Sequence, residues 1–110
     1  MSRDRGNRAP AWWADFIRPH WPAAEKTPNG RPGRDIIGTP GIAFVIKTSG
    51  AGNWRPAAAI AQAVKNAHGD IAAVVYFPPG VGADSCAKAQ ILMSAEHFIE
   101  LALEAGYGER

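Results

Sequence analysis

The stretch that decides the fold is residues 33–47, which read GRDIIGTPGIAFVIK. Its centre, Thr39-Pro40-Gly41, is a turn signal, because proline presets a turn backbone and glycine adopts conformations that other residues avoid. The β-branched and aromatic residues on either side are typical of strands. The stretch therefore predicts a β-hairpin, with Asp35 at the start of its first strand and Lys47 near the end of its second.

Hydrophobic periodicity outward from the hairpin predicts further helices and strands. The helices are expected at 9–18, with Pro10 in the first turn, at 57–67, and after Ser94 as the cap; the other strands are expected at 23–27, 71–77 and 89–93. The order is α-β-β-β-α-β-β-α. It predicts an α/β domain in which a mixed sheet is flanked by helices.

The length of 110 residues and a hydrophobic content of 46% predict a single domain over residues 9–110. Residues 1–8 are polar and basic, and we expect them to form a disordered tail. No apolar run is long enough to span a bilayer, and no apolar stretch follows the N-terminus as in a secretory signal. The single cysteine, Cys86, also suits a reducing interior, so we expect a cytoplasmic protein without membrane contact.

Charge is distributed unevenly along the chain. Residues 1–55 hold nine Lys/Arg against four Asp/Glu, whereas residues 56–110 hold three against six. A basic half suits a polyanionic partner such as DNA, because each neutralised phosphate releases counterions. The alternative is that the arginines only keep the chain soluble.

The predicted hairpin would also gather groups that suit a divalent cation. Alternate strand residues point to the same face, so position 45 and Lys47 project together, and the partner strand would bring Asp35 beside them. Mg²⁺ in proteins is typically held by one or two carboxylates together with water. A nearby lysine neutralises charge that develops during phosphodiester hydrolysis. The pattern therefore predicts a Mg²⁺ or Mn²⁺ site.

With these residues in place, the chain resembles the PD-(D/E)XK nuclease superfamily, and more narrowly the small Holliday-junction-resolvase-like nucleases of actinobacterial phages. The resemblance runs from about Trp12 to Gly106 and depends on element order more than on any one motif. It implies a restriction-endonuclease-like core and a metal-dependent endonuclease that cuts branched DNA as a homodimer. It also implies a phage-infected or bacterial host cell as the setting.

The resemblance assigns roles to individual residues. Asp35 resembles the metal-binding aspartate, Lys47 the catalytic lysine, and the Ile46 carbonyl a further metal ligand. Gln62 and Lys65 match polar positions near the scissile phosphate, and Glu25 is a candidate accessory acid.

The remaining expected contacts are to DNA. Arg31, Arg34, Arg55 and Lys65 are candidates for phosphates, and Trp54, beside a glycine-rich loop, is a candidate for stacking on a base.

One departure from the family pattern bears on whether the chain is an active nuclease or a fold that binds without cutting. Val45 stands where the family has a glutamate, and valine cannot hold a metal. If Glu25 or Asp15 replaces that carboxylate, the enzyme interpretation gains. If the surroundings of Val45 are apolar and closed, the chain is better explained as a degenerate nuclease fold that binds DNA or protein without cutting. A third alternative is an interaction protein unrelated to nucleases.

Overall fold

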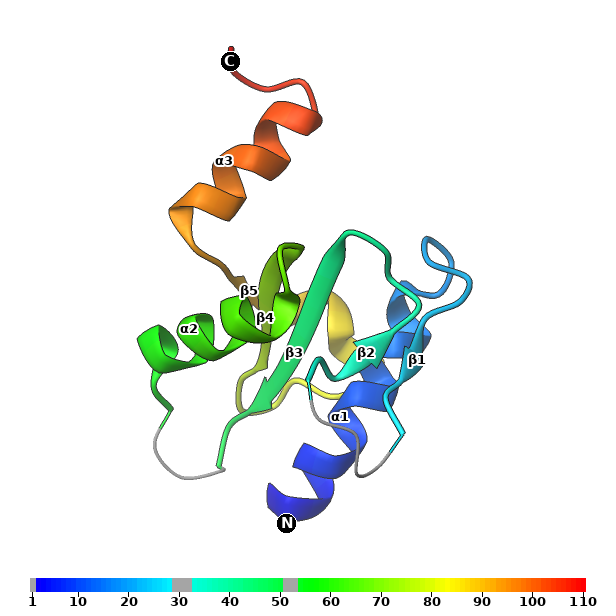
Figure 1. The fold of residues 1–110 in the computed structure, drawn as a ribbon. Helices are drawn as coiled ribbons and strands as arrows, with labels where there is room; N and C mark the ends of the chain where they lie inside the picture. Colours follow the sequence, from blue (N-terminus) through cyan, green and yellow to red (C-terminus); the bar gives the residue numbers. More distant parts are fainter. Residues whose placement is uncertain (1, 29–32, 51–53) are drawn as a thin grey trace.

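The computed structural model describes residues 2–28, 33–50 and 54–110, with side chains from Gly6 onward (Figure 1). Its elements are α1 (Ser2–Ile17), β1 (Glu25–Lys26), β2 (Ile36–Ile37), β3 (Ile42–Thr48), α2 (Pro56–Ala67), β4 (Ile71–Phe77), the 3₁₀-helix η1 (Ala83–Lys88), β5 (Gln90–Leu92) and α3 (Ala95–Glu104). β3, β4 and β5 form a mixed sheet in the order β3-β4-β5.

The central strand β4 pairs in parallel with β3 and antiparallel with β5. The β3–β4 register places Lys47 beside Tyr76 and Val45 beside Val74. A parallel pair needs a crossover connection, and α2 supplies it. Both long strands are nearly continuous apolar runs, as expected where a sheet is covered on both faces.

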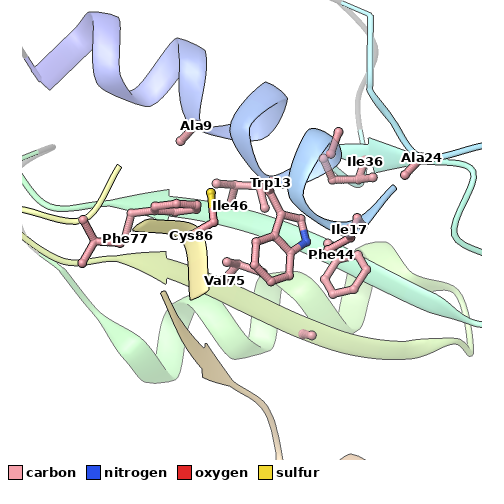
Figure 2. Packing of buried hydrophobic residues seen from close by; sticks show 13 residues of the cluster. Ala9, Trp13, Ile17, Ala24, Ile36, Phe44, Ile46, Val75, Phe77 and Cys86 are labelled. Atoms are coloured by element: carbon pink, nitrogen blue, oxygen red, sulfur yellow. The ribbon is translucent and has the colours of Figure 1, made fainter. Parts of the chain in front are cut away.

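Two separate apolar clusters cover the two faces of the sheet. On one face α2 packs against β3 and β4, and the buried members of this cluster are Ala43, Val45, Ala59, Ala63, Ala67, Ala72 and Val74. On the other face α1 lays Trp13 and Ile17 against Phe44 and Val75 (Figure 2). The Trp13 ring meets Phe44 edge-on, with ring centroids 5.6 Å apart. The sheet is therefore the middle layer between α1 and α2.

Most of the expected elements are confirmed. α2, β4 and the segment around β5 lie where the periodicity placed them, and Ser94 caps α3 by accepting a hydrogen bond from the His97 N–H at 3.1 Å. The order differs from the expectation by η1, a 3₁₀-helix between β4 and β5. The structure therefore confirms a mixed sheet flanked by helices, but not the exact order of elements that was expected.

The expected hairpin needs a correction. β2 pairs with β1, with Glu25 opposite Ile37 and Lys26 opposite Ile36, rather than forming a ladder with β3. The chain before β2 still touches β3, since the Asp35 N–H donates to the Phe44 carbonyl at 3.1 Å. Asp35 thus contacts the edge of β3 without forming a strand ladder with it.

The expected N-terminal tail is also corrected, because helix α1 begins at Ser2 and Pro10 lies inside it. The segment is held against the domain: Ala9 is fully buried, and the Asn7 carbonyl accepts a hydrogen bond from Lys26 Nζ at 3.1 Å. These contacts offset the backbone hydrogen bond that Pro10 cannot donate.

Within the described ranges, none of the helices combines the length and the apolar character needed to cross a bilayer.

Candidate functional site

The site is built on the free edge of β3. Asp35 Oδ2 accepts a hydrogen bond from the Ile46 N–H at 2.7 Å. Phe44 and Ile46 both direct their backbone polar groups away from β4, which pairs with the other edge of β3. Because the N–H and the C=O of a strand residue point the same way, the Ile46 carbonyl shares this edge with the Asp35 carboxylate. The structure thus brings Asp35, Ile46 and Lys47 together at one strand edge, whereas position 45, which was expected beside them, lies in the apolar cluster with α2.

A cavity of about 370 Å³ opens at this edge. Its charged lining residues are Lys26, Arg34, Asp35 and Lys47. Lys26 is also bonded to the Asn7 carbonyl, as described above. Asp35 is thus one carboxylate among three cationic side chains, an arrangement that attracts anions.

Burial raises the pKa of the Asp35 carboxyl above its usual value of 3.8, and the Ile46 N–H and the positive charge of Lys47 oppose this rise only in part. Removal from water therefore outweighs the nearby positive charge at this carboxylate.

Arg34 is tied to the end of α2. Its Nη1 donates to Asp70 Oδ2 at 3.0 Å, and its Nη2 donates to the Ala67 carbonyl at 2.9 Å. The guanidinium thus has structural partners already. Any phosphate contact by Arg34 must share the group with Asp70.

A second, larger cavity of about 700 Å³ shares Gly6, Ile46 and Lys47 with the first. Its other side is formed by the start of α2 and the end of β4, and includes Trp54, Arg55, Gln62 and Tyr76. The Trp54 and Tyr76 rings are stacked, with centroids 4.5 Å apart and an interplanar angle of 10°. Lys47 thus lies between an acid-containing cavity and a cavity with an aromatic wall.

Val45 lies outside both cavities. It is buried in the apolar cluster between the sheet and α2, whose other buried members include Ala59, Ala63 and Val74. The surroundings of Val45 are therefore apolar and closed. This is the outcome that favours binding without hydrolysis over the enzyme interpretation.

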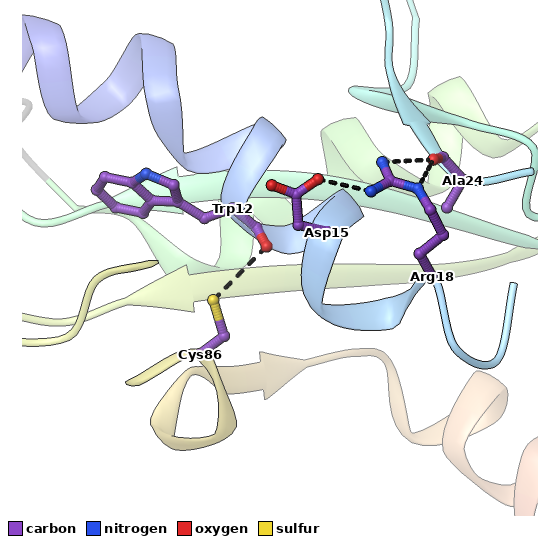
Figure 3. A network of polar contacts seen from close by, with 5 residues as sticks. All are labelled: Trp12, Asp15, Arg18, Ala24 and Cys86. Atoms are coloured by element: carbon purple, nitrogen blue, oxygen red, sulfur yellow. Dashed lines mark hydrogen bonds and ion pairs between the residues drawn. The ribbon is translucent and has the colours of Figure 1, made fainter. Parts of the chain in front are cut away.

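Neither candidate acid replaces the absent carboxylate. Glu25 is exposed on β1, and its neighbour Lys26 lines the cavity; adjacent strand residues point to opposite faces, so Glu25 faces away from the site. Asp15 pairs with Arg18 at 2.6 Å, and Arg18 also donates to the Ala24 carbonyl (Figure 3). In the described part of the chain, no group of three or more His, Cys, Asp or Glu residues could hold a metal ion.

The fit to a divalent cation is therefore incomplete. The described residues offer the Asp35 carboxylate and the Ile46 carbonyl, which is one charged ligand where the nuclease pattern that the sequence resembles has at least two. Affinity for a hard cation depends on the number of charged ligands, so this pair alone does not make up a complete site for Mg²⁺ or Mn²⁺.

The other expected site residues have mixed outcomes. Gln62, Arg55 and Trp54 line the larger cavity as a group. Lys65 is exposed in the last turn of α2 and lines neither cavity. Arg31 lies outside the described residues. The sequence named Arg55 and Trp54 only as candidate DNA contacts; the structure places both in a cavity that Lys47 also lines.

Two residues of the site were not anticipated, Lys26 and Tyr76. Lys26 could have been found from the alternation of β1, which exposes Glu25 and turns its neighbour toward the cavity. Tyr76 is the last residue but one of β4, and only the parallel register places it beside Lys47. The register of a parallel pair has no local sequence signal, so Tyr76 could not have been found in this way.

Comparisons with models of known protein families, with curated proteins and with solved structures find no match for this chain.

Proposed function

We propose that the protein binds DNA through the two cavities beside β3 and does not hydrolyse it. The observation that carries this proposal is the composition of the site: Lys26 and Lys47 flank one partly buried carboxylate, and Val45 is closed in the apolar cluster where a second carboxylate would be needed. A cationic cavity with a single acid suits a bound phosphate better than a bound metal ion. Branched DNA is the form of DNA that the resemblance to resolvase-like nucleases implies.

In this proposal Lys47 is the central contact, because it lines both cavities. Lys26 and Lys47 bind the backbone phosphate, and Arg55 extends the positive surface along the larger cavity. The stacked Trp54–Tyr76 pair forms an aromatic wall beside Lys47, next to the proposed position of the DNA phosphates. Aromatic rings beside a basic groove are typical of proteins that accept unpaired bases.

A second candidate function is metal-dependent cleavage of branched DNA by an endonuclease of the Holliday-junction-resolvase type. It is favoured by the meeting of Asp35, the Ile46 carbonyl and Lys47 at one strand edge, with Gln62 in the adjoining cavity. A bound Mg²⁺ or Mn²⁺ would polarise the phosphate and acidify a water molecule. Asp35 would hold the metal, and Lys47 would stabilise negative charge on the phosphate. If this second candidate is right, we expect the protein to act in the cytoplasm of a bacterial or phage-infected cell.

The test measures binding and cleavage of a labelled four-way junction and of a linear duplex, without metal and with Mg²⁺ or Mn²⁺. The proteins are the wild type, Lys47→Ala, Asp35→Asn and Val45→Glu. Lys88→Ala is the matched control, because Lys88 lies in η1 and lines neither cavity.

We expect the wild type to bind the junction without cutting it, and Lys47→Ala to weaken binding about tenfold while Lys88→Ala changes it little. Cleavage by the wild type that disappears in Asp35→Asn would replace this proposal by the second candidate. Cleavage gained only in Val45→Glu supports a nuclease fold that has lost its metal ligand. Absence of salt-sensitive binding by every protein would overturn both functions.

A further inference from the structure

The larger of the two cavities beside β3, of about 700 Å³, has a different lining from the smaller one. Its charged residues are Lys47 and Arg55, and no acid is among the described residues that line it. Trp54 and Tyr76 form an aromatic wall, and Gln62 adds a polar side chain from α2. Aromatic cavities of this size with a few polar groups are typical of sites that hold a small organic group.

Lys47 and Tyr76 project from the same face of the sheet. They are partners in the parallel register, and Val45 and Val74, two residues earlier on each strand, are buried under α2. Since alternate strand residues point to the same face, Lys47 and Tyr76 continue this face just beyond the apolar cluster. The cation therefore lies beside the aromatic wall.

The Trp54 ring is held in place before any ligand binds. It stacks on Tyr76 with an interplanar angle of 10°, and it also packs against the apolar cluster under α2. Because Trp54 is only partly buried and lines the cavity, a planar ring that enters the cavity can extend the stack. A ring that is already oriented loses little conformational freedom on binding.

A nucleotide carries the groups that this part of the molecule can bind. Its base is a planar ring for the aromatic wall, and the exposed Gln62 amide offers the base edge both a donor and an acceptor. Its phosphate suits Lys47, which also lines the smaller cavity. A paired base is enclosed in the duplex, so only an unpaired base can enter a protein cavity.

We propose that the larger cavity holds the base of one unpaired nucleotide of DNA, stacked on Trp54, while the phosphate of that nucleotide lies at Lys47. Gln62 contacts the edge of the base. This inference rests on the proposed DNA binding and adds the part of the DNA that is recognised. Phosphate contacts alone do not separate a paired from an unpaired nucleotide, whereas a base in the cavity does.

The first experiment compares two labelled duplexes that differ in one group. One carries a single unpaired adenine at its centre, and the other carries an abasic site at the same unpaired position. Both have the same number of phosphates, so the salt-dependent part of binding is matched. Fluorescence anisotropy without metal gives the ratio of the two Kd values. We expect the wild type to bind the adenine duplex at least about fivefold more tightly than the abasic duplex.

Substitutions in the same assay locate the base. Trp54→Leu should bring the ratio close to one, whereas Trp54→Phe, which keeps an aromatic ring, should retain more of it. Gln62→Leu should lower the ratio about threefold, because one contact to the base edge is lost. Tyr107→Leu is the matched control and should keep the wild-type ratio, since Tyr107 is 73% exposed and lines neither cavity beside β3.

The wild-type ratio tests the inference even if Trp54→Leu does not fold. A wild-type ratio near one, with salt-sensitive binding of both duplexes, would overturn this inference and leave the proposed DNA binding intact. Absence of salt-sensitive binding to either duplex would overturn both. Equal ratios in Trp54→Leu and Tyr107→Leu would place the base elsewhere on the protein. Displacement of the adenine duplex by micromolar deoxyadenosine monophosphate would make a free nucleotide the ligand instead.

Discussion

The Asp35 carboxylate and the Ile46 backbone N–H are joined by a hydrogen bond of 2.7 Å at the free edge of β3. An unpaired strand edge presents N–H and C=O groups that need partners. Asp35 therefore stabilises the sheet edge as well as lining the cavity. Burial disfavours the charged form of the same carboxylate, whereas the Ile46 N–H and Lys47 favour it. The balance between these effects can be measured as a dependence of stability on pH.

Asp35→Asn is expected to make the protein more stable near neutral pH. The pKa of Asp35 is raised in the folded state, so the folded protein binds this proton more tightly than the unfolded chain does. The free energy of unfolding of the wild type must then fall as pH rises from about 3.8 through the folded pKa, and stay level above it. Urea denaturation of both proteins across this pH range measures the effect.

The asparagine oxygen can still accept the Ile46 N–H, so the comparison isolates the charge. We expect the two proteins to converge below the usual pKa of aspartate and to separate as pH rises. A wild type that gains stability relative to Asp35→Asn over the same interval would show that Lys47 and the Ile46 N–H outweigh burial.

The elements with local signals could be predicted from the sequence, and those set by distant contacts could not. α2 begins at a proline and α3 at the Ser94 cap, so both were predictable. β1 and β2 contain only two residues each, and which strand β2 pairs with depends on contacts that no local pattern encodes. The site follows the same rule: Asp35 and Lys47 were found, whereas Tyr76 needed the parallel register.

Val45→Glu is expected to lower the free energy of unfolding by about 2–4 kcal/mol in the absence of metal, because a carboxylate enters the apolar cluster under α2. Val45→Gln has nearly the same size without the charge and is the control. Thermal unfolding of both variants, with and without Mn²⁺, measures the difference. Selective stabilisation of Val45→Glu by Mn²⁺ indicates that the new carboxylate reaches the Asp35 edge; equal responses of the two variants contradict that geometry.

Gly38→Ala is expected to destabilise the protein far more than Gly41→Ala. Both glycines have positive φ, +82° and +85°, which costs an alanine about 1–2 kcal/mol. At Gly38 an added Cβ would also lie 1.9 Å from the Ala23 carbonyl oxygen, whereas at Gly41 it meets nothing within 4 Å. Chemical denaturation should show Gly38→Ala to be worse by at least about 2 kcal/mol. Equal losses would mean that the segment around Ala23 shifts freely.

Arg34→Ala is expected to cost about 1–2 kcal/mol of stability, because two hydrogen bonds from a partly buried guanidinium to Asp70 and Ala67 are lost. Arg110→Ala is the matched control: its ion pair with Glu104 is mostly exposed and is worth less than about 1 kcal/mol. A double-mutant cycle with Asp70→Asn separates the ion pair from the Ala67 bond. A coupling energy near zero would assign the whole effect to the Ala67 carbonyl.

Removing Lys26 or Lys47 is expected to reduce the salt dependence of DNA binding. Each phosphate contact that is lost lowers the slope of log K against log salt by about 1, so Lys26→Ala and Lys47→Ala should each show this change. Lys65→Ala should leave the slope unaltered, because Lys65 lines neither cavity although it is one helix turn beyond Gln62. Fluorescence anisotropy over a series of salt concentrations measures the three slopes. A larger change for Lys65→Ala than for Lys47→Ala would place the DNA on the outer side of α2.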